Sequence, residues 1–178
     1  MKDILTKAVD FGRSLGAEYI ELRAQNLFKT LLITKDGTVE GAKEGTETGA
    51  GIRALADGAW GFVSIGKLES AQLTDAVTEA VLLAKAAGLR VKKPVKLAEV
   101  KAVEDRVVAA PRKNPQNVSM EEKIENILTM DKTVFGYDKR IRSCTINYLD
   151  VIGTNIFVNS DGTCIEPVSY THLTLPTN

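Results

Sequence analysis

The chain has 178 residues, of which 44% are hydrophobic and 26% charged, a balance typical of a folded protein with its own core. Basic and acidic residues are equal at 23 each, which excludes the positive excess of a nucleic-acid or membrane surface. No stretch approaches a membrane span of roughly 20 apolar residues, and the N-terminus has no signal-peptide pattern, so we expect a cytoplasmic protein.

The N-terminal third predicts a short helix followed by two hairpins. Apolar residues at helical spacing precede Gly16, which supplies a stop signal. Residues 19–24 alternate as a half-buried strand does, and residues 30–34 are rich in β-formers. Asp36-Gly37 then suits a type I′ turn into a strand over residues 38–42, because both central residues of that turn need positive φ.

After a polar gap at residues 43–47, a second hairpin pairs residues 50–56 with residues 59–65 through Asp57-Gly58. An apolar stripe then runs from Leu73 to Ala87 at helical spacing and ends at Gly88. Many of its positions are alanine, so we expect this helix to pack very close to the sheet.

Residues 89–118 lack a regular apolar pattern and contain scattered charges and prolines at positions 94, 111 and 115. This composition predicts a linker with one strand near residues 106–109. Ser119 and Glu122 then form a capping box that starts another helix. Strands over residues 141–148 and 154–158 and an Asp161-Gly162 turn follow.

These elements predict an α/β fold of the α+β type, with antiparallel hairpins, helices packed on one face and two subdomains. We expect a first domain over residues 1–88, a linker over 89–118, and the start of a middle domain over 119–166.

The C-terminal segment, residues 167–178, has no periodicity of its own. Residues 168–177 read Val-Ser-Tyr-Thr-His-Leu-Thr-Leu-Pro-Thr, which resembles the in-frame translation of the adapter used in transposase-based DNA library preparation. We therefore expect a tail that is not native protein. His172, the only histidine of the chain, lies in it.

No catalytic, cofactor-binding or metal-binding residue is expected in this chain. A peptidase zinc site needs three protein ligands, and Cys144 and Cys164 with one suspect histidine do not supply it. Three glutamates, Glu40, Glu44 and Glu47, are better interpreted as a solvated strand edge than as a metal cluster. Trp60 is better interpreted as a core or covering aromatic than as a ligand platform.

Residues 48–64, Thr-Gly-Ala-Gly-Ile-Arg-Ala-Leu-Ala-Asp-Gly-Ala-Trp-Gly-Phe-Val-Ser, resemble the signature hairpin of the TldD/PmbA family, formerly described as modulators of DNA gyrase. The leading helix, the Asp-Gly hairpin, the Ala-rich helix and residues 114–123 follow in the family's order, and Trp60 is nearer the TldD branch. The resemblance covers nearly all of residues 1–166.

The resemblance implies a cytoplasmic zinc metallopeptidase that acts in proteolysis on peptides or unfolded segments. It also implies assembly, either as a heterodimer with a TldD/PmbA-type partner subunit or with a second copy of itself. The family's His-Glu-x-x-x-His zinc motif matches no residue here, so we expect a truncated N-terminal scaffold that is inactive alone and holds no cofactor, with zinc in the full-length protein. The alternative is a non-enzymatic module that binds peptides by strand addition at a sheet edge such as residues 30–34.

Overall fold

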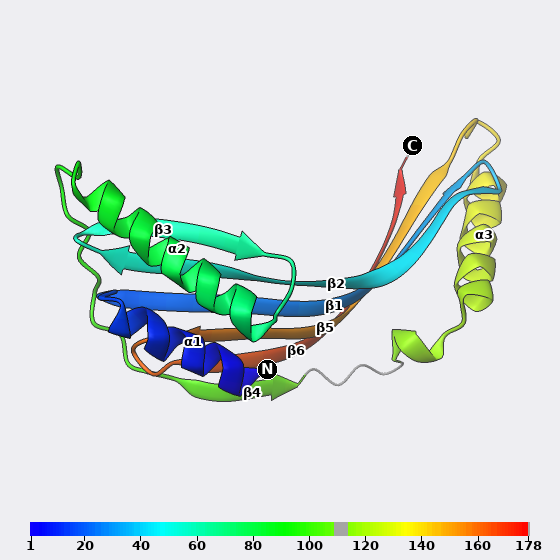
Figure 1. Cartoon of the computed structure of the whole chain (residues 1–178). Helices are drawn as coiled ribbons and strands as arrows, with labels where there is room; N and C mark the ends of the chain where they lie inside the picture. The colour runs from blue at the N-terminus through cyan, green and yellow to red at the C-terminus, as the bar shows by residue number, and fades with distance from the viewer. Residues whose placement is uncertain (109–113, 178) are drawn as a thin grey trace. The chain divides into compact units, whose positions relative to one another are not determined.

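The computed structural model describes residues 1–108 and 114–177, without the side chains of residues 169–177. Three α-helices, one short 3-10 helix and six strands follow one another in the described chain (Figure 1). In chain order they are α1 (Lys2–Ser14), β1 (Tyr19–Lys35), β2 (Thr38–Ala56), β3 (Ala59–Ile65), α2 (Ser70–Gly88), β4 (Glu104–Val108), η1 (Pro115–Asn117), α3 (Met120–Tyr137), β5 (Thr145–Asn159) and β6 (Cys164–Thr177). The strands form one sheet in the order β3-β2-β1-β5-β6-β4, and the expected α+β class is confirmed.

The chain divides into two compact units. Unit 1 consists of Met1–Asn26, Thr48–Val107 and Thr154–Pro167, and unit 2 consists of Leu27–Glu47, Val108–Gly153 and Val168–Asn178. The strands β1, β2, β4, β5 and β6 each contribute residues to both units. The domain boundary expected at residues 89–118 stays a prediction.

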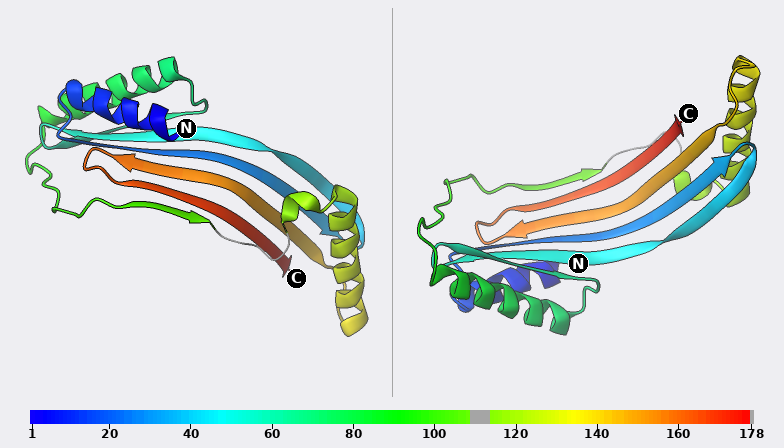
Figure 2. Two further views of the ribbon diagram at one scale, coloured as in Figure 1. Left: turned by 90° about the horizontal axis from the view of Figure 1, so that it is seen from below. Right: turned by 90° about the horizontal axis from the view of Figure 1, so that it is seen from above.

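In unit 1, α1 and α2 cover one face of the sheet (Figure 2). The core lies between them and the strands, and it includes Ile20, Leu22 and Ala24, the alternate positions that the sequence predicts. The helix α2 approaches very closely, because a Cβ at Gly61 of β3 would lie 2.0 Å from the carbonyl oxygen of Ala80. The expected close packing of the Ala-rich helix is therefore confirmed.

The three Asp-Gly turns form as predicted. Asp36 and Gly37 have φ of 49° and 78°, and Asp57 and Gly58 have φ of 50° and 71°, as a type I′ turn requires. The pairing of Ala56 with Ala59 closes the second hairpin. At the third turn, the side-chain oxygen of Asn159 accepts hydrogen bonds from the backbone N–H groups beyond it.

The strands are longer than the sequence predicts. Residues 19–24 and 30–34 belong to one continuous strand, β1, and the polar gap at residues 43–47 lies inside β2. The same correction applies to β5, where one strand replaces the two predicted ones and begins only at Thr145. Backbone hydrogen bonds between strands do not depend on the side chains, so a strand can continue through a polar segment. The sequence reveals a strand only where one face is buried, because apolar and polar residues alternate there.

The helix α2 ends at Gly88, as the sequence predicts, but without a left-handed cap. Leu89 follows in the right-handed helical region. A Cβ at Gly88 would lie 2.6 Å from the Cβ of Asp57. The glycine therefore permits close approach of the helix end to the β2–β3 turn.

Unit 2 has its own core beneath α3. The Ser119 hydroxyl accepts a hydrogen bond from the Glu122 backbone N–H at 3.1 Å, as the predicted helix start requires. Beneath the helix lies a small cluster of buried residues: Leu32, Ile127, Cys144, Ile146 and Tyr148.

Asp36 connects the first turn to the segment before β5. Its carboxylate accepts a hydrogen bond from the backbone N–H of Cys144 at 2.8 Å and one from the Ser143 hydroxyl at 3.3 Å. These donors lower the pKa of Asp36 below its ordinary value, the backbone N–H contributing most.

Two predictions fall wholly or partly outside the described structure. In the linker, Ala109 and Pro111 lie outside the described residues, while β4 covers Glu104–Val108. In the tail, β6 continues to Thr177, but the side chain of His172 is not described. No helix in the described chain is long and apolar enough to cross a membrane.

Candidate functional site

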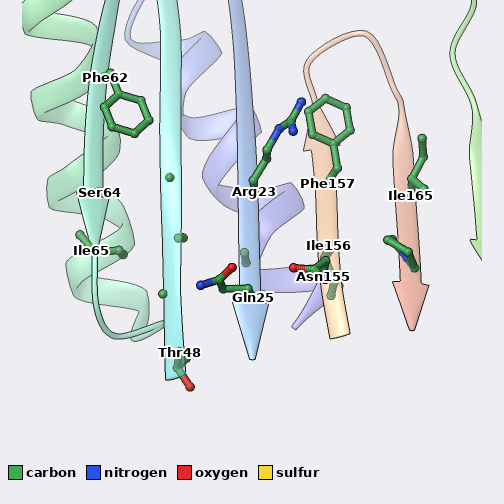
Figure 3. Close-up of a pocket in the computed structure, with 15 residues that line it drawn as sticks. Arg23, Gln25, Thr48, Phe62, Ser64, Ile65, Asn155, Ile156, Phe157 and Ile165 are labelled. Carbon is green, nitrogen blue, oxygen red and sulfur yellow. The ribbon is translucent and has the colours of Figure 1, made fainter. Parts of the chain in front are cut away.

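The sheet face of unit 1 opposite α1 and α2 contains an open pocket of about 970 Å³. Because Ile20, Leu22 and Ala24 point toward the helices, strand alternation places Arg23 and Gln25 on this opposite face. Five neighbouring strands contribute to the pocket, and all its lining residues belong to unit 1 (Figure 3).

One wall of the pocket combines a cation with an aromatic ring. The guanidinium carbon of Arg23 on β1 lies 5.1 Å from the ring centroid of Phe157 on β5, within the range of a cation–π contact. The carboxamides of Gln25 and Asn155 lie beside this pair on the same two strands (Figure 3). Among the described lining residues Arg23 is the only charged one.

The other wall is Phe62 on β3, whose side chain is 62% exposed. Between the two walls β2 contributes Gly49 and Gly51, which have no side chain of their own. A Cβ at Gly49 would lie 2.8 Å from the carbonyl oxygen of Ile65, whereas a Cβ at Gly51 would meet only the Phe62 ring, at 3.4 Å. The fold therefore requires a glycine at position 49, but position 51 has room for a methyl group.

Farther along the same face, four residues from three strands form a cluster of mutual polar and aromatic contacts. Arg53 forms a 2.9 Å ion pair with Glu21 and lies 4.4 Å above the Trp60 ring. Tyr19 meets Trp60 edge-on at 5.9 Å and donates a 2.8 Å hydrogen bond to Glu21. Burial, with this hydrogen bond to a carboxylate, raises the pKa of Tyr19 to about 12. Trp60 is thus a covering aromatic, as the sequence predicts.

Unit 2 contains a buried ion pair. Lys123 of α3 and Asp150 of β5 lie 2.8 Å apart, with their side chains 5% and 0% exposed. Lys123 also donates to the hydroxyl of Thr30 at 3.1 Å, and the Tyr148 hydroxyl donates to Asp150 at 2.7 Å. These contacts join α3 to the strands β1 and β5.

A second carboxylate, that of Asp131, is buried on the same helix. Its Oδ1 atom has no hydrogen-bond partner in the described structure. Burial, with Asp131 nearby, raises the pKa of the Cys144 thiol, so this thiol remains protonated at neutral pH.

The described residues do not fit a zinc site. Among them no group of three or more His, Cys, Asp or Glu side chains is placed to hold a metal ion. Cys144 belongs to unit 2 and Cys164 to unit 1, and both are free thiols. The three glutamates Glu40, Glu44 and Glu47 are exposed along β2, and Glu47 pairs with Lys29.

Sequence reasoning did not predict the pocket or the buried ion pair. The pocket unites residues far apart in the chain, and only the pairing of β1 with β5 brings Arg23 beside Phe157. One sequence signal for the buried charges was available. Lys123 and Asp131 stand at helical spacing on either side of Ile127, which places both on the apolar face of α3. Charged residues on a buried face are almost always paired.

Two models of one family match the chain. The PmbA/TldA metallopeptidase domain 1 matches residues 20–87, and the PmbA/TldA metallopeptidase central domain matches residues 113–173. A metalloprotease of Methanocaldococcus jannaschii is 30% identical over 149 residues, which are 84% of this chain and 33% of that protein. A metalloprotease of Methanothermobacter thermautotrophicus is 26% identical over 84% of this chain and 31% of its own length.

Solved structures share the fold. A protein from Bacteroides thetaiotaomicron described as a modulator of DNA gyrase superimposes with a TM-score of 0.71 at 18% identity, over 98% of this chain and 39% of that one. TldE from Thermococcus kodakarensis gives a TM-score of 0.69 at 13% identity, over 97% and 39%. This chain spans about a third of the length of the curated relatives it matches. Because the two family models together match well over half of its residues, the chain belongs to the PmbA/TldD metallopeptidase family.

Proposed function

We propose that this chain is the N-terminal scaffold part of a zinc metallopeptidase that acts on peptides or unfolded segments in the cytoplasm. Zinc would be held by residues of the complete protein outside this chain. The catalytic assembly would contain a TldD/PmbA-type partner subunit or a second copy of the same protein.

The match to two consecutive domains of one metallopeptidase family carries this proposal. The possible zinc ligands among the described residues agree with a scaffold role, since the two thiols lie in separate units and the carboxylates are scattered. Carboxylates alone favour harder cations than zinc. What this chain supplies is the open pocket with Arg23.

The alternative, a peptide-binding module that uses strand addition at residues 30–34, loses its proposed edge. These residues lie in β1, which has β2 on one side and β5 on the other in the sheet. Thr30, Leu32 and Thr34 are each fully buried. Strand addition requires a free row of backbone N–H and C=O groups, and an interior strand has none.

Zinc content and hydrolysis of the complete gene product test the proposal, with the 178-residue chain as the comparison. We expect the complete product to contain zinc and to lose peptide hydrolysis on chelation, since the metal activates the attacking water. The chain alone should show no one-to-one zinc binding below micromolar concentration by calorimetric titration. Hydrolysis by the complete product that survives complete removal of the metal would contradict the proposal.

A further inference from the structure

We propose that the Arg23 pocket binds the free C-terminus of a peptide whose last residue is aromatic. The inference rests on the proposed action on peptides, but it requires neither zinc nor hydrolysis. It names a ligand end that the family match does not specify.

Charge is the first argument. Arg23 is the only charged side chain among the described residues that line the pocket, and its guanidinium lies over the ring of Phe157. A guanidinium stacked on a ring keeps its N–H groups, which lie in its plane, available to an acceptor. Carboxylates match these donors in a bidentate geometry.

Shape is the second argument. Phe62 on β3 and Phe157 on β5 stand on two sides of the pocket, with β2 and β1 between them (Figure 3). Gly49 and Gly51 of β2 add no side chain of their own, and the Phe62 ring reaches over Gly51. Aromatic rings prefer offset or edge-to-face contacts with a further ring, at centroid distances of roughly 4.5–7 Å. The pocket volume of about 970 Å³ exceeds one aromatic side chain, so it has room for the last residues of a peptide.

The short distance between cation and ring selects a C-terminus over an acidic side chain. The Arg23 guanidinium carbon is only 5.1 Å from the Phe157 centroid. A C-terminal residue carries its carboxylate and its side chain on the same Cα, so it can reach both groups. In an extended peptide neighbouring side chains point to opposite faces, and the next one on the same face is about 7 Å away. An internal Asp or Glu carries its carboxylate on a different residue from the aromatic ring, so a longer stretch of the peptide must be ordered to reach both groups, at a greater cost in conformational entropy.

Fluorescence anisotropy with the 178-residue chain tests the inference. The probe is fluorescein-labelled Gly-Ser-Gly-Gly-Phe with a free carboxylate. Two matched probes are the same peptide amidated at its C-terminus and Gly-Ser-Asp-Gly-Phe-amide, which restores the charge as an internal side chain. We expect binding of the free acid to be about tenfold tighter or more than that of either amide, as loss of a charge-assisted hydrogen bond implies.

Two pocket variants with matched controls locate the site. Arg23→Gln should weaken binding of the free acid about tenfold and leave that of the amide unchanged, whereas Arg13→Gln on the exposed side of α1 should change neither. Gly51→Ala should weaken binding of both probes, because the added methyl group lies beneath the Phe62 ring and narrows the pocket there. Its control, Gly45→Ala on the same strand, meets no atom within 4 Å. Far-ultraviolet circular dichroism checks that each variant is folded.

Equal binding of the free acid and Gly-Ser-Asp-Gly-Phe-amide would overturn the C-terminal selection and leave peptide binding intact. Binding of the free acid that is unchanged by both Arg23→Gln and Gly51→Ala would overturn the location. Absence of binding by all three probes would overturn the inference as a whole, while zinc-dependent hydrolysis by the complete gene product would still support the proposed function.

Discussion

Replacement of Lys123 by methionine tests how α3 is held on unit 2. Methionine keeps most of the length and volume of the side chain but removes the ammonium group that pairs with Asp150 at 2.8 Å. The Asp150 carboxylate, fully buried, then keeps the hydrogen bond from Tyr148 on Oδ2. Its other oxygen already has no partner in the described structure.

The expected cost is large because the charge left behind is buried. Removing one partner of a buried ion pair costs about 3–5 kcal/mol, against a total stability of about 5–15 kcal/mol for a typical domain. Lys132→Met on the same helix removes an exposed charge and should cost under about 0.5 kcal/mol. The double variant Lys123→Met with Asp150→Leu should recover most of the loss, since an apolar pair can replace a buried ion pair with little penalty.

Hydrogen exchange of the α3 amides is the appropriate assay, because two compact units need not unfold together. Lys123→Met should speed exchange of the most protected amides in Met120–Tyr137 at least about a hundredfold, the factor that corresponds to 3 kcal/mol. A change below about fivefold, equal to that of Lys132→Met, would refute the reasoning. In that case, solvent or relaxation of the helix would compensate the charge of Asp150 that remains in the variant.

Four further outcomes are expected. Deletion of Val168–Asn178 should leave the thermal midpoint unchanged within error, and a drop of several degrees would show that the segment is a native strand. Gly61→Ala should lower the midpoint in urea by the equivalent of about 3 kcal/mol or more, since its Cβ meets helix backbone, while Gly45→Ala should not. The lowered pKa of Asp36 contributes stability that is present above the ordinary carboxyl pKa of 3.8 and is lost as the pH falls through the lower folded pKa. Asp36→Asn should therefore remove this part of the acid dependence of unfolding. An unchanged dependence of stability on acid pH in the variant would contradict this expectation. Cys144 should react with a thiol reagent only on local opening, because the thiol is buried and protonated; reaction as fast as that of a free thiol in native protein would contradict its burial.

Local chemistry in the sequence determined the turns, the helices and the faces of the strands. A type I′ turn needs positive φ at both central residues, which Asp-Gly tolerates, so the turns at Asp36 and Asp57 follow from two residues each. The Ser119 cap and the alternation of Ile20 with Leu22 are likewise signals within a few residues. The order of such elements also sufficed to indicate the family.

Only the tertiary structure decided how far each strand extends and what lies beside it. The polar residues of β2 at positions 43–47 are strand because a neighbouring backbone supplies their ladder hydrogen bonds, which no local pattern records. The pocket has the same origin, since Arg23 and Phe157 meet only through the pairing of β1 with β5. Gly88 ends α2 as the sequence predicts, but its close approach to Asp57 joins two segments that the sequence places far apart. Each of these features depends on non-local contacts, and no short stretch of sequence encodes them.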